Sequence, residues 1–440
     1  MIRREEGFTL VELLITMVVF VLVIAAASSI FSSLLNQFKQ QSRIMESNTE
    51  GVVGLEMLRS DLQQAGFGLP WHAETGGPED ADDNWQALDR YLEAAGASNS
   101  DPTDPSYYND GDTPSAFPGP PINRAPRAIL AQNDAGPELG NGLHSDYLVV
   151  KSTSIGLGAP AQKWTYITND DDVISVRIWN PTNDPAAAKN AYEDLENNDL
   201  VVLERAAMGT GGLNQRVLLT NGGAFFTTFM DTAAAFPAAF KPLLSGDTNI
   251  IYGVATTALR APFNRADFYV AAPVDNMPSK CAPNTGILYK AVMNQGTGAG
   301  GGDFTRYPLL DCVADMQVVF LTFEDLNNNG TMEAKELQLE NADYPYTTFG
   351  ATGQGLIAQE IRDRVKGVVV YVLAHEGQRD TNFTFNNFST GCGVGNCIRV
   401  GDFDNLGNLM GREFDLSRIG AGFANYRWKV YKIAAELPNL

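Results

Sequence analysis

The chain has 440 residues, a formal net charge of −21 at pH 7, and 42 Gly and 22 Pro. This length is enough for one large domain or two ordinary ones, each with a hydrophobic core. The negative charge excludes nucleic acid as an expected partner, because nucleic-acid phosphates would repel it. The many glycines and prolines favour turns and short strands over a helical bundle.

The chain opens with a segment that is long and apolar enough to cross a membrane. No charged side chain occurs from Leu13 to Phe38, and about 20 apolar helical residues span a bilayer core. Arg3 and Arg4 precede this run, which predicts a cytoplasmic N-terminus and an exported remainder. A cleaved secretory signal is one interpretation, because residues 25–28 resemble a small-residue processing site. A plain membrane anchor is another.

A more specific pattern precedes the apolar run. Residues 7–12 read Gly-Phe-Thr-Leu-Val-Glu and resemble the processing motif of type IV prepilins. The resemblance implies that a prepilin peptidase cuts after Gly7 and that the new N-terminal residue, Phe8, is N-methylated. Residues 1–7 are then a leader, and residues 8–31 are a transmembrane and filament-core helix.

Glu12 is an unusual residue within such a helix. A carboxylate that lies deep and unpaired in an apolar span costs about 2–3 kcal/mol. Cleavage after Gly7 would leave an amine on Phe8, one helical turn away on the same face. The resemblance implies that Glu12 pairs with the Phe8 amine of a neighbouring subunit and thereby sets the axial register of assembly. The alternative is a glutamate that is relieved only by the dipole of the helix N-terminus.

The helix is expected to continue beyond the membrane. Apolar residues recur at three- and four-residue spacings through residues 32–65, which predicts an amphipathic helix. Gly66, Gly68 and Pro70 end the pattern. A helix over residues 9–65 would be about 85 Å long. Its first half would lie in the membrane or filament, and its second half would pack under a globular head.

The exported part divides into two regions by composition. Residues 66–142 contain acidic clusters, glycines and prolines and are interpreted as an irregular acidic insertion with solvated loops. Residues 143–440 contain short apolar or alternating runs bounded by turn residues, which predicts an antiparallel β-rich head. The predicted fold class is therefore α+β and pilin-like, with a long N-terminal helix, membrane-spanning in its first half, packed on that head.

Several blocks of the exported part resemble PilW-type minor pilins. They are Leu55–Gly66, Leu143–Val150, Asn198–Glu204, Leu309–Phe320, Ile361–Leu373 and the closing Tyr426–Tyr431. The resemblance implies a minor pilin, not an enzyme, at or near the filament tip, where it primes assembly. It implies as partners other minor and major pilins, the prepilin peptidase, the inner membrane and a pilus tip adhesin. The protein would lie in the inner membrane with an exported head, and on the cell surface after assembly into a pilus.

Two alternatives remain open at this point. A J-type pseudopilin of a type II secretion system has the same opening and a similar helix. A membrane-tethered, calcium-dependent adhesin or binding module would also carry such an anchor.

A candidate calcium site follows one of the predicted strands. Six residues match ligand positions 1, 3, 5, 7, 9 and 12 of the twelve-residue calcium loop, and Gly330 stands at position 6. The six are Asp325, Asn327, Asn329, Thr331, Glu333 and Glu336. Three carboxylates predict a weak, structural site with a Kd on the order of 10⁻⁴ M or weaker. The alternative is a hairpin turn at Asn-Asn-Gly.

The four cysteines and three histidines are sparse. An even number of cysteines suits an exported protein: Cys392 and Cys397 would close a small loop, and Cys281 would then pair with Cys312. Other pairings, and free thiols, remain open. The histidines are scattered without a catalytic motif, and His375 is expected at the surface.

Overall fold

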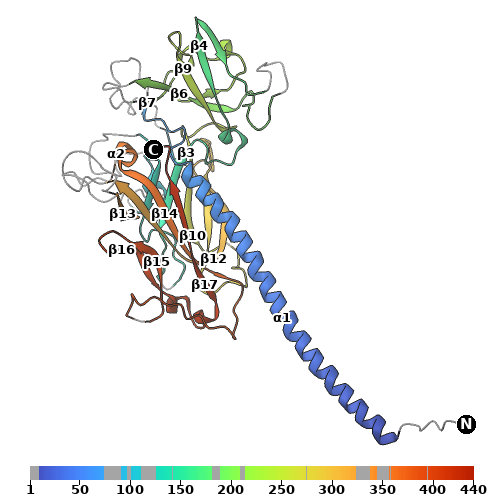
Figure 1. Cartoon of the computed structure of the whole chain (residues 1–440). Coiled ribbons are helices and arrows are strands. Elements are labelled where there is room, and N and C mark those ends of the chain that lie inside the picture. Colours follow the sequence, from blue (N-terminus) through green and yellow to red (C-terminus); the bar gives the residue numbers. More distant parts are fainter. Residues whose placement is uncertain are drawn as a thin grey trace, which may run out of the picture.

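The computed structural model describes residues 9–73, 91–96, 101–110, 125–140, 142–180, 189–208, 214–273, 275–323, 337–343, 356, 358–393 and 395–440. A long N-terminal helix stands against a head that contains two large β-sheets (Figure 1). This arrangement confirms the predicted α+β class, with an apolar helix followed by a large antiparallel β-sheet.

The helix α1 is one continuous element, Leu10–Gln63, of 54 residues, which corresponds to about 81 Å. Gly66 and Gly68 follow it with φ angles of 81° and 61°, a region that glycine adopts without steric cost. The Gly66 N–H then donates to the Lys151 carbonyl at 3.0 Å. The chain therefore leaves the helix directly onto the head, as the glycines in the sequence predict.

The main sheet is antiparallel and has β12 near its centre. Its spatial order, within the described residues, is β17 (Arg427–Glu436), β14 (Val365–Glu376), β12 (Phe304–Phe323), β11 (Gly286–Met293), β10 (Asn264–Ala271), β3 (Tyr147–Ser152) and β2 (Ile129–Gln132), while β13 (Leu337–Asn341) also pairs with β12. The strands β3, β10 and β11 are buried along their whole length. Such strands need cover on both faces of the sheet.

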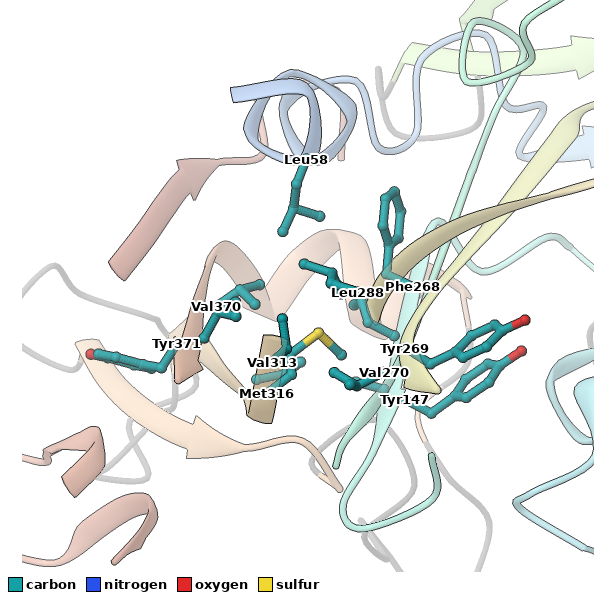
Figure 2. Packing of buried hydrophobic residues seen from close by; sticks show 14 of the residues in the cluster. Leu58, Tyr147, Phe268, Tyr269, Val270, Leu288, Val313, Met316, Val370 and Tyr371 are labelled. Atoms are coloured by element: carbon teal, nitrogen blue, oxygen red, sulfur yellow. The ribbon is translucent and has the colours of Figure 1, made fainter. Parts of the chain in front are cut away.

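One face of this sheet is covered by the second half of α1. Leu58 and Leu62 are fully buried, and Figure 2 shows Leu58 directed from the helix toward Phe268 and Leu288 on the sheet. The opposite face is covered by residues 91–96 and 101–110 and by a hairpin. That hairpin consists of β15 (Cys397–Phe403) and β16 (Leu409–Asp415).

The second sheet, here called the outer sheet, lies at the end of the head where α1 stops (Figure 1). In the described part of the chain its order is β1 (His72–Ala73), β7 (Asn214–Leu218), β6 (Leu200–Met208), β9 (Thr248–Ala255), β4 (Trp164–Asp170) and β5 (Val173–Val176), with β8 (Thr227–Thr228) paired to β6. It has its own core, which includes Ile167, Val201, Phe229 and Phe240. The predicted single head at residues 143–440 is thus built on two sheets.

Short helices complete the described chain. They are α2 (Ala358–Arg364) and the 3₁₀ turns η2 (Pro105–Tyr108), η3 (Ala159–Gln162), η4 (Ala233–Ala235), η5 (Ala238–Phe240), η8 (Leu416–Ile419) and η9 (Phe423–Asn425).

The region predicted as an irregular insertion, residues 66–142, differs from that expectation in its described part, which also contains β1 and η2. Ile129–Gln132 forms β2, an edge strand paired with β3. Glu93 is fully buried, and its carboxylate lies 2.6 Å from the ammonium of Lys151, which also binds Asp110 at 2.6 Å. Glu93 and Asp110 therefore do not belong to solvated loops, because their carboxylates neutralise a cation that is buried on the main sheet.

The buried charges form a balanced network. Arg265 binds Asp267 through two hydrogen bonds of 2.7 and 2.8 Å and reaches the Pro105 carbonyl at 2.8 Å. Arg127 lies 2.5 Å from Asp110. Three cations therefore face three carboxylates. Burial alone would raise the pKa of Asp110, but Arg127 and Lys151 together hold it below the ordinary value. Ion pairs and hydrogen bonds thus fix residues 91–96 and 101–110 against the sheet.

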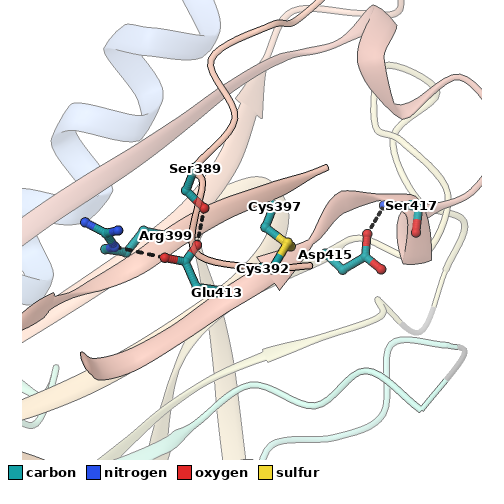
Figure 3. Close-up of a disulfide and its surroundings, with 7 residues drawn as sticks. All are labelled: Ser389, Cys392, Cys397, Arg399, Glu413, Asp415 and Ser417. Carbon is teal, nitrogen blue, oxygen red and sulfur yellow. Dashed lines mark hydrogen bonds and ion pairs between the residues drawn. A yellow bond between two sulfur atoms is a disulfide. The ribbon is translucent and has the colours of Figure 1, made fainter. Parts of the chain in front are cut away.

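All four cysteines form disulfides. Cys281 pairs with Cys312 of β12, and Cys392 pairs with Cys397 at the start of β15. Figure 3 shows that Ser389 and Arg399 both bind Glu413 beside the second disulfide, with an Arg399–Glu413 distance of 3.0 Å. The short loop is therefore closed covalently and by polar contacts with the hairpin.

Candidate assembly site on the N-terminal helix

The first turn of α1 is set by a threonine cap. Thr9 is extended, and its hydroxyl accepts a hydrogen bond from the Glu12 N–H at 3.3 Å. This bond satisfies one of the backbone donors that a helix N-terminus leaves free. Glu12 therefore lies in the first turn with its side chain exposed, where a negative charge is favoured by the helix dipole.

The first half of α1 makes an exposed apolar rod. Leu10–Ser32 is long and apolar enough to span a membrane, and none of it is buried within the chain. Side chains such as Leu14, Phe20 and Phe31 are 58–66% exposed. A continuous apolar surface of this length requires lipid or other protein around it. Its length of about 34 Å matches the hydrocarbon core of a bilayer.

The second half of α1 is seated on the head by close backbone contact. A Cβ on Gly54 would lie 1.9 Å from the carbonyl oxygen of Leu309, a residue of β12. Gly51, one turn earlier, lies against the Leu310 side chain. Glycine at position 54 lets the helix approach the strand backbone more closely than any side chain would permit, whereas Gly51 faces only the end of a side chain.

A buried ion pair also joins the helix to the sheet. Asp61 lies 2.8 Å from the ammonium of Lys290 on β11, and both residues are buried. Burial raises the pKa of Asp61, and the charge of Lys290 opposes that rise. No local sequence pattern predicts this pair, because its members are 229 residues apart. The first half of α1 is therefore free to assemble, while the second half is fixed to the head.

Comparison with protein families decides the class of this helix. Residues 2–28 match the family model described as the prokaryotic N-terminal methylation motif. No curated protein and no solved structure matches the chain. The motif and the exposed apolar helix occur together here. The chain thus carries the N-terminal motif and the apolar helix of a type IV pilin-like protein. Pilin-like proteins with this motif are structural subunits that interact with other pilins and with the prepilin peptidase.

Several predicted site residues of this pilin-like protein lie outside the described residues. They are Gly7 and Phe8 at the processing site, and all six predicted calcium ligands between Asp325 and Glu336. The structure does describe the strands on either side of the calcium loop: Phe323 of β12 pairs with Leu337 of β13. The loop therefore connects two paired antiparallel strands.

The histidine expected at the surface of the pilin-like protein is instead buried. His375 is 2% exposed, and its Nε2 accepts a hydrogen bond from the Ala282 N–H at 2.9 Å. Its ring packs against Tyr426 and Trp428. Burial lowers its pKa to about 4, so it is neutral at pH 7. The expectation was wrong because a strand that looks terminal in the sequence is covered by other elements in the fold.

Proposed function

We propose that this pilin-like protein is a PilW-like minor pilin that takes part in type IV pilus assembly at or near the filament tip. Support comes from one observation above the others: a predominantly apolar helical segment of 23 residues, Leu10–Ser32, is presented without any cover from the head. A soluble enzyme or binding module has no use for such a rod, whereas a subunit that moves from membrane to filament requires it.

Glu12 is proposed to make the contact that sets the register between subunits. The Thr9 cap begins the helix directly after Phe8, so peptidase cleavage after Gly7 would place the Phe8 amine beside the first helical turn. In an apolar filament core, an ammonium of one subunit and the Glu12 carboxylate of the next would each be costly alone and stabilised together. N-methylation of Phe8 keeps the positive charge of the amine.

The head supports a position at the end of the filament rather than along it. In a filament the helices pack side by side, so the width of each head limits how closely subunits approach. The outer sheet adds a second sheet and a second core to the head. A low-copy position at the tip accommodates this bulk, because no further head has to pack beyond it.

The experiment replaces Glu12 in the chromosomal gene and counts surface pili. Glu12→Gln removes the charge and keeps the shape, so we expect processing to continue and incorporation into pili to be lost. Glu56→Gln is the matched control, because Glu56 is an exposed glutamate on the same helix outside the apolar rod. Gly7→Ala should abolish processing. Normal incorporation of the Glu12→Gln protein would contradict the proposed role of Glu12, and a processed Gly7→Ala protein would contradict the whole proposal.

The same strain separates a pilin from a type II secretion pseudopilin. Deletion of the gene should reduce surface pili and leave the secreted enzymes of the culture medium unchanged. The opposite result would assign the protein to the secretion system instead: the pili would be intact, and the enzymes would stay inside the cells rather than reach the medium.

Calcium is proposed as a structural ligand of the loop at residues 325–336. The ligand spacing of this loop supports the site, and its position between the paired ends of β12 and β13 would allow calcium to stiffen a hairpin. Titration of the full chain with calcium, followed by calorimetry, should give binding that Glu336→Gln removes. Surface attachment that requires calcium while pilus number does not would favour the alternative, a calcium-dependent adhesin.

A further inference from the structure

A cluster of aromatic side chains forms a small pocket at the free edge of the outer sheet. The cavity has a volume of about 260 Å³ and is lined by Gln162, Lys163, Trp164, Trp179, Tyr192 and Glu193. Trp164 is 42% exposed and Tyr192 is 90% exposed. The exposed parts of these two rings add little to the stability of the fold, because only surface removed from water contributes. We propose that this pocket binds a neutral saccharide.

The rings of the pocket are held in place before any ligand binds. Trp164 and Trp179 meet edge to face with centroids 5.3 Å apart, and the Trp179 indole N–H donates to the Trp164 carbonyl at 2.7 Å. Tyr166, which lies on β4 with Trp164, also contacts Trp179, with ring centroids 5.8 Å apart. A ligand that enters therefore orders few side chains, which lowers the entropic cost of binding.

A buried carboxylate joins the two walls of the pocket. Asp194 is 2% exposed and accepts hydrogen bonds from two backbone N–H groups, that of Trp179 at 2.5 Å and that of Asn190 at 2.7 Å. Asn190 in turn accepts from the Tyr192 N–H at 3.1 Å and donates to Glu193 at 2.7 Å. Asp194 is thus a positioning residue that holds Trp179 and Asn190 together, and Asn190 in turn fixes the Tyr192 backbone and the Glu193 side chain.

The chemistry of the lining selects the ligand class. The faces of indole and phenol rings carry negative charge density, which attracts the weakly positive C–H groups on the apolar face of a pyranose. Gln162, Lys163 and Glu193 line the same cavity and supply donors and acceptors for ring hydroxyls. The volume lies just below the range of about 300–1,000 Å³ for drug-sized ligands, which suits one sugar ring at the end of a glycan.

Charged ligands fit the pocket less well. Aromatic pockets also bind quaternary ammonium groups, but the Arg177 guanidinium already lies 5.5 Å from the Trp179 ring, and Lys163 lines the cavity. A further cation would meet these two positive charges. An anion would meet Glu193 and a chain of net charge −21. A ligand with hydroxyl groups and no charge avoids both penalties.

The test measures saccharide binding to the full chain in a polyoxyethylene detergent, which carries no sugar headgroup. The probes are glucose, galactose, mannose, N-acetylglucosamine and their β-linked disaccharides, followed by saturation-transfer NMR and tryptophan fluorescence. At least one probe should bind, and Tyr192→Ala and Trp164→Ala should each weaken it about tenfold, the effect of losing one aromatic contact. Tyr192→Ala is expected to leave folding unchanged because the side chain is exposed. Tyr307→Ala is the control, since it removes a partly exposed aromatic ring outside the pocket and should leave binding unchanged.

Three results would overturn the proposal. The first is no response to any probe at about 20 mM, a concentration that detects even millimolar affinity. The second is saccharide binding that Tyr192→Ala and Trp164→Ala leave as strong as in the parent. The third is binding of choline in place of the saccharides, which would assign the pocket to a cationic ligand. None of these results bears on assembly through Glu12.

Discussion

The contact between Gly54 and Leu309 allows a sharp test of how α1 is held on the head. In Gly54→Ala, the new methyl group would lie 1.9 Å from the Leu309 carbonyl oxygen and 2.6 Å from its carbonyl carbon. The helix would have to retreat from β12 and loosen the buried Leu58 and Leu62. Overpacking of this kind costs about 1–3 kcal/mol, while alanine in place of glycine gains about 1 kcal/mol of helix propensity. We expect a net loss of up to about 2 kcal/mol.

Gly51→Ala is the matched control on the same helix. Its methyl group would meet the Leu310 Cδ1 atom at 2.9 Å, the end of a side chain that can rotate away. The propensity gain should therefore dominate, and stability should stay equal or rise by up to about 1 kcal/mol.

Urea denaturation gives the stability of both variants, and amide exchange over residues 51–63 reports local release of the helix from the head. Gly54→Ala should accelerate exchange over this segment, whereas Gly51→Ala should not. Equal effects of the two substitutions, or a stabilised Gly54→Ala protein, would refute close backbone contact as the cause.

Three further measurements concern the head. Glu204 is fully buried, and burial raises its pKa from 4.5 to about 7. Because the folded state holds this proton more tightly than the unfolded state, the contribution of Glu204 to stability is complete below pH 4.5 and falls by about 3 kcal/mol as the pH rises to 7. Glu204→Gln should therefore be more stable than the parent at pH 8 and not at pH 4, and a difference independent of pH would contradict this. The Cys281–Cys312 disulfide spans 31 residues, and its removal should lower the free energy of unfolding, measured in urea, by about 3–4 kcal/mol. An unchanged free energy would show that this disulfide does not constrain the unfolded chain. Lys151→Met should cost about 3–5 kcal/mol because it leaves two buried carboxylates without this cation; a neutral effect in the same assay would mean that these carboxylates protonate at little cost.

The N-terminal helix could be predicted from sequence because its signals are local. The apolar run, the spacing of Leu55, Leu58 and Leu62, and the glycines after Gln63 all lie within one segment. The helix observed at Leu10–Gln63 agrees with the predicted 9–65 to within two residues at each end. Membrane insertion and helix termination depend on neighbouring residues, so a linear pattern contains the information.

The second sheet and the buried charges could not be predicted in this way. Arg265 and Lys151 look like surface residues in a linear sequence, yet both are fully buried. Lys151 is neutralised by Glu93 and Asp110, which approach from a segment that looked like a solvated insertion, and Arg265 is neutralised mainly by Asp267. The division into two sheets has the same origin, since β4 pairs with β9 across about 80 residues. Such pairings depend on tertiary contacts that no local pattern records.

The position of the outer sheet reconciles a large head with assembly through the helix. The first strand of this sheet, β1 (His72–Ala73), follows soon after α1 ends and pairs with β7, and Arg216 of β7 donates to the Gly66 carbonyl at 3.2 Å. It therefore lies at the end of α1 farthest from Leu10 (Figure 1). Bulk added there leaves the sides of the apolar rod uncovered, so the rod stays available for packing while the size of the head favours the proposed position at the filament tip. In that proposed position, the outer sheet and its pocket would face away from Leu10 and the rod.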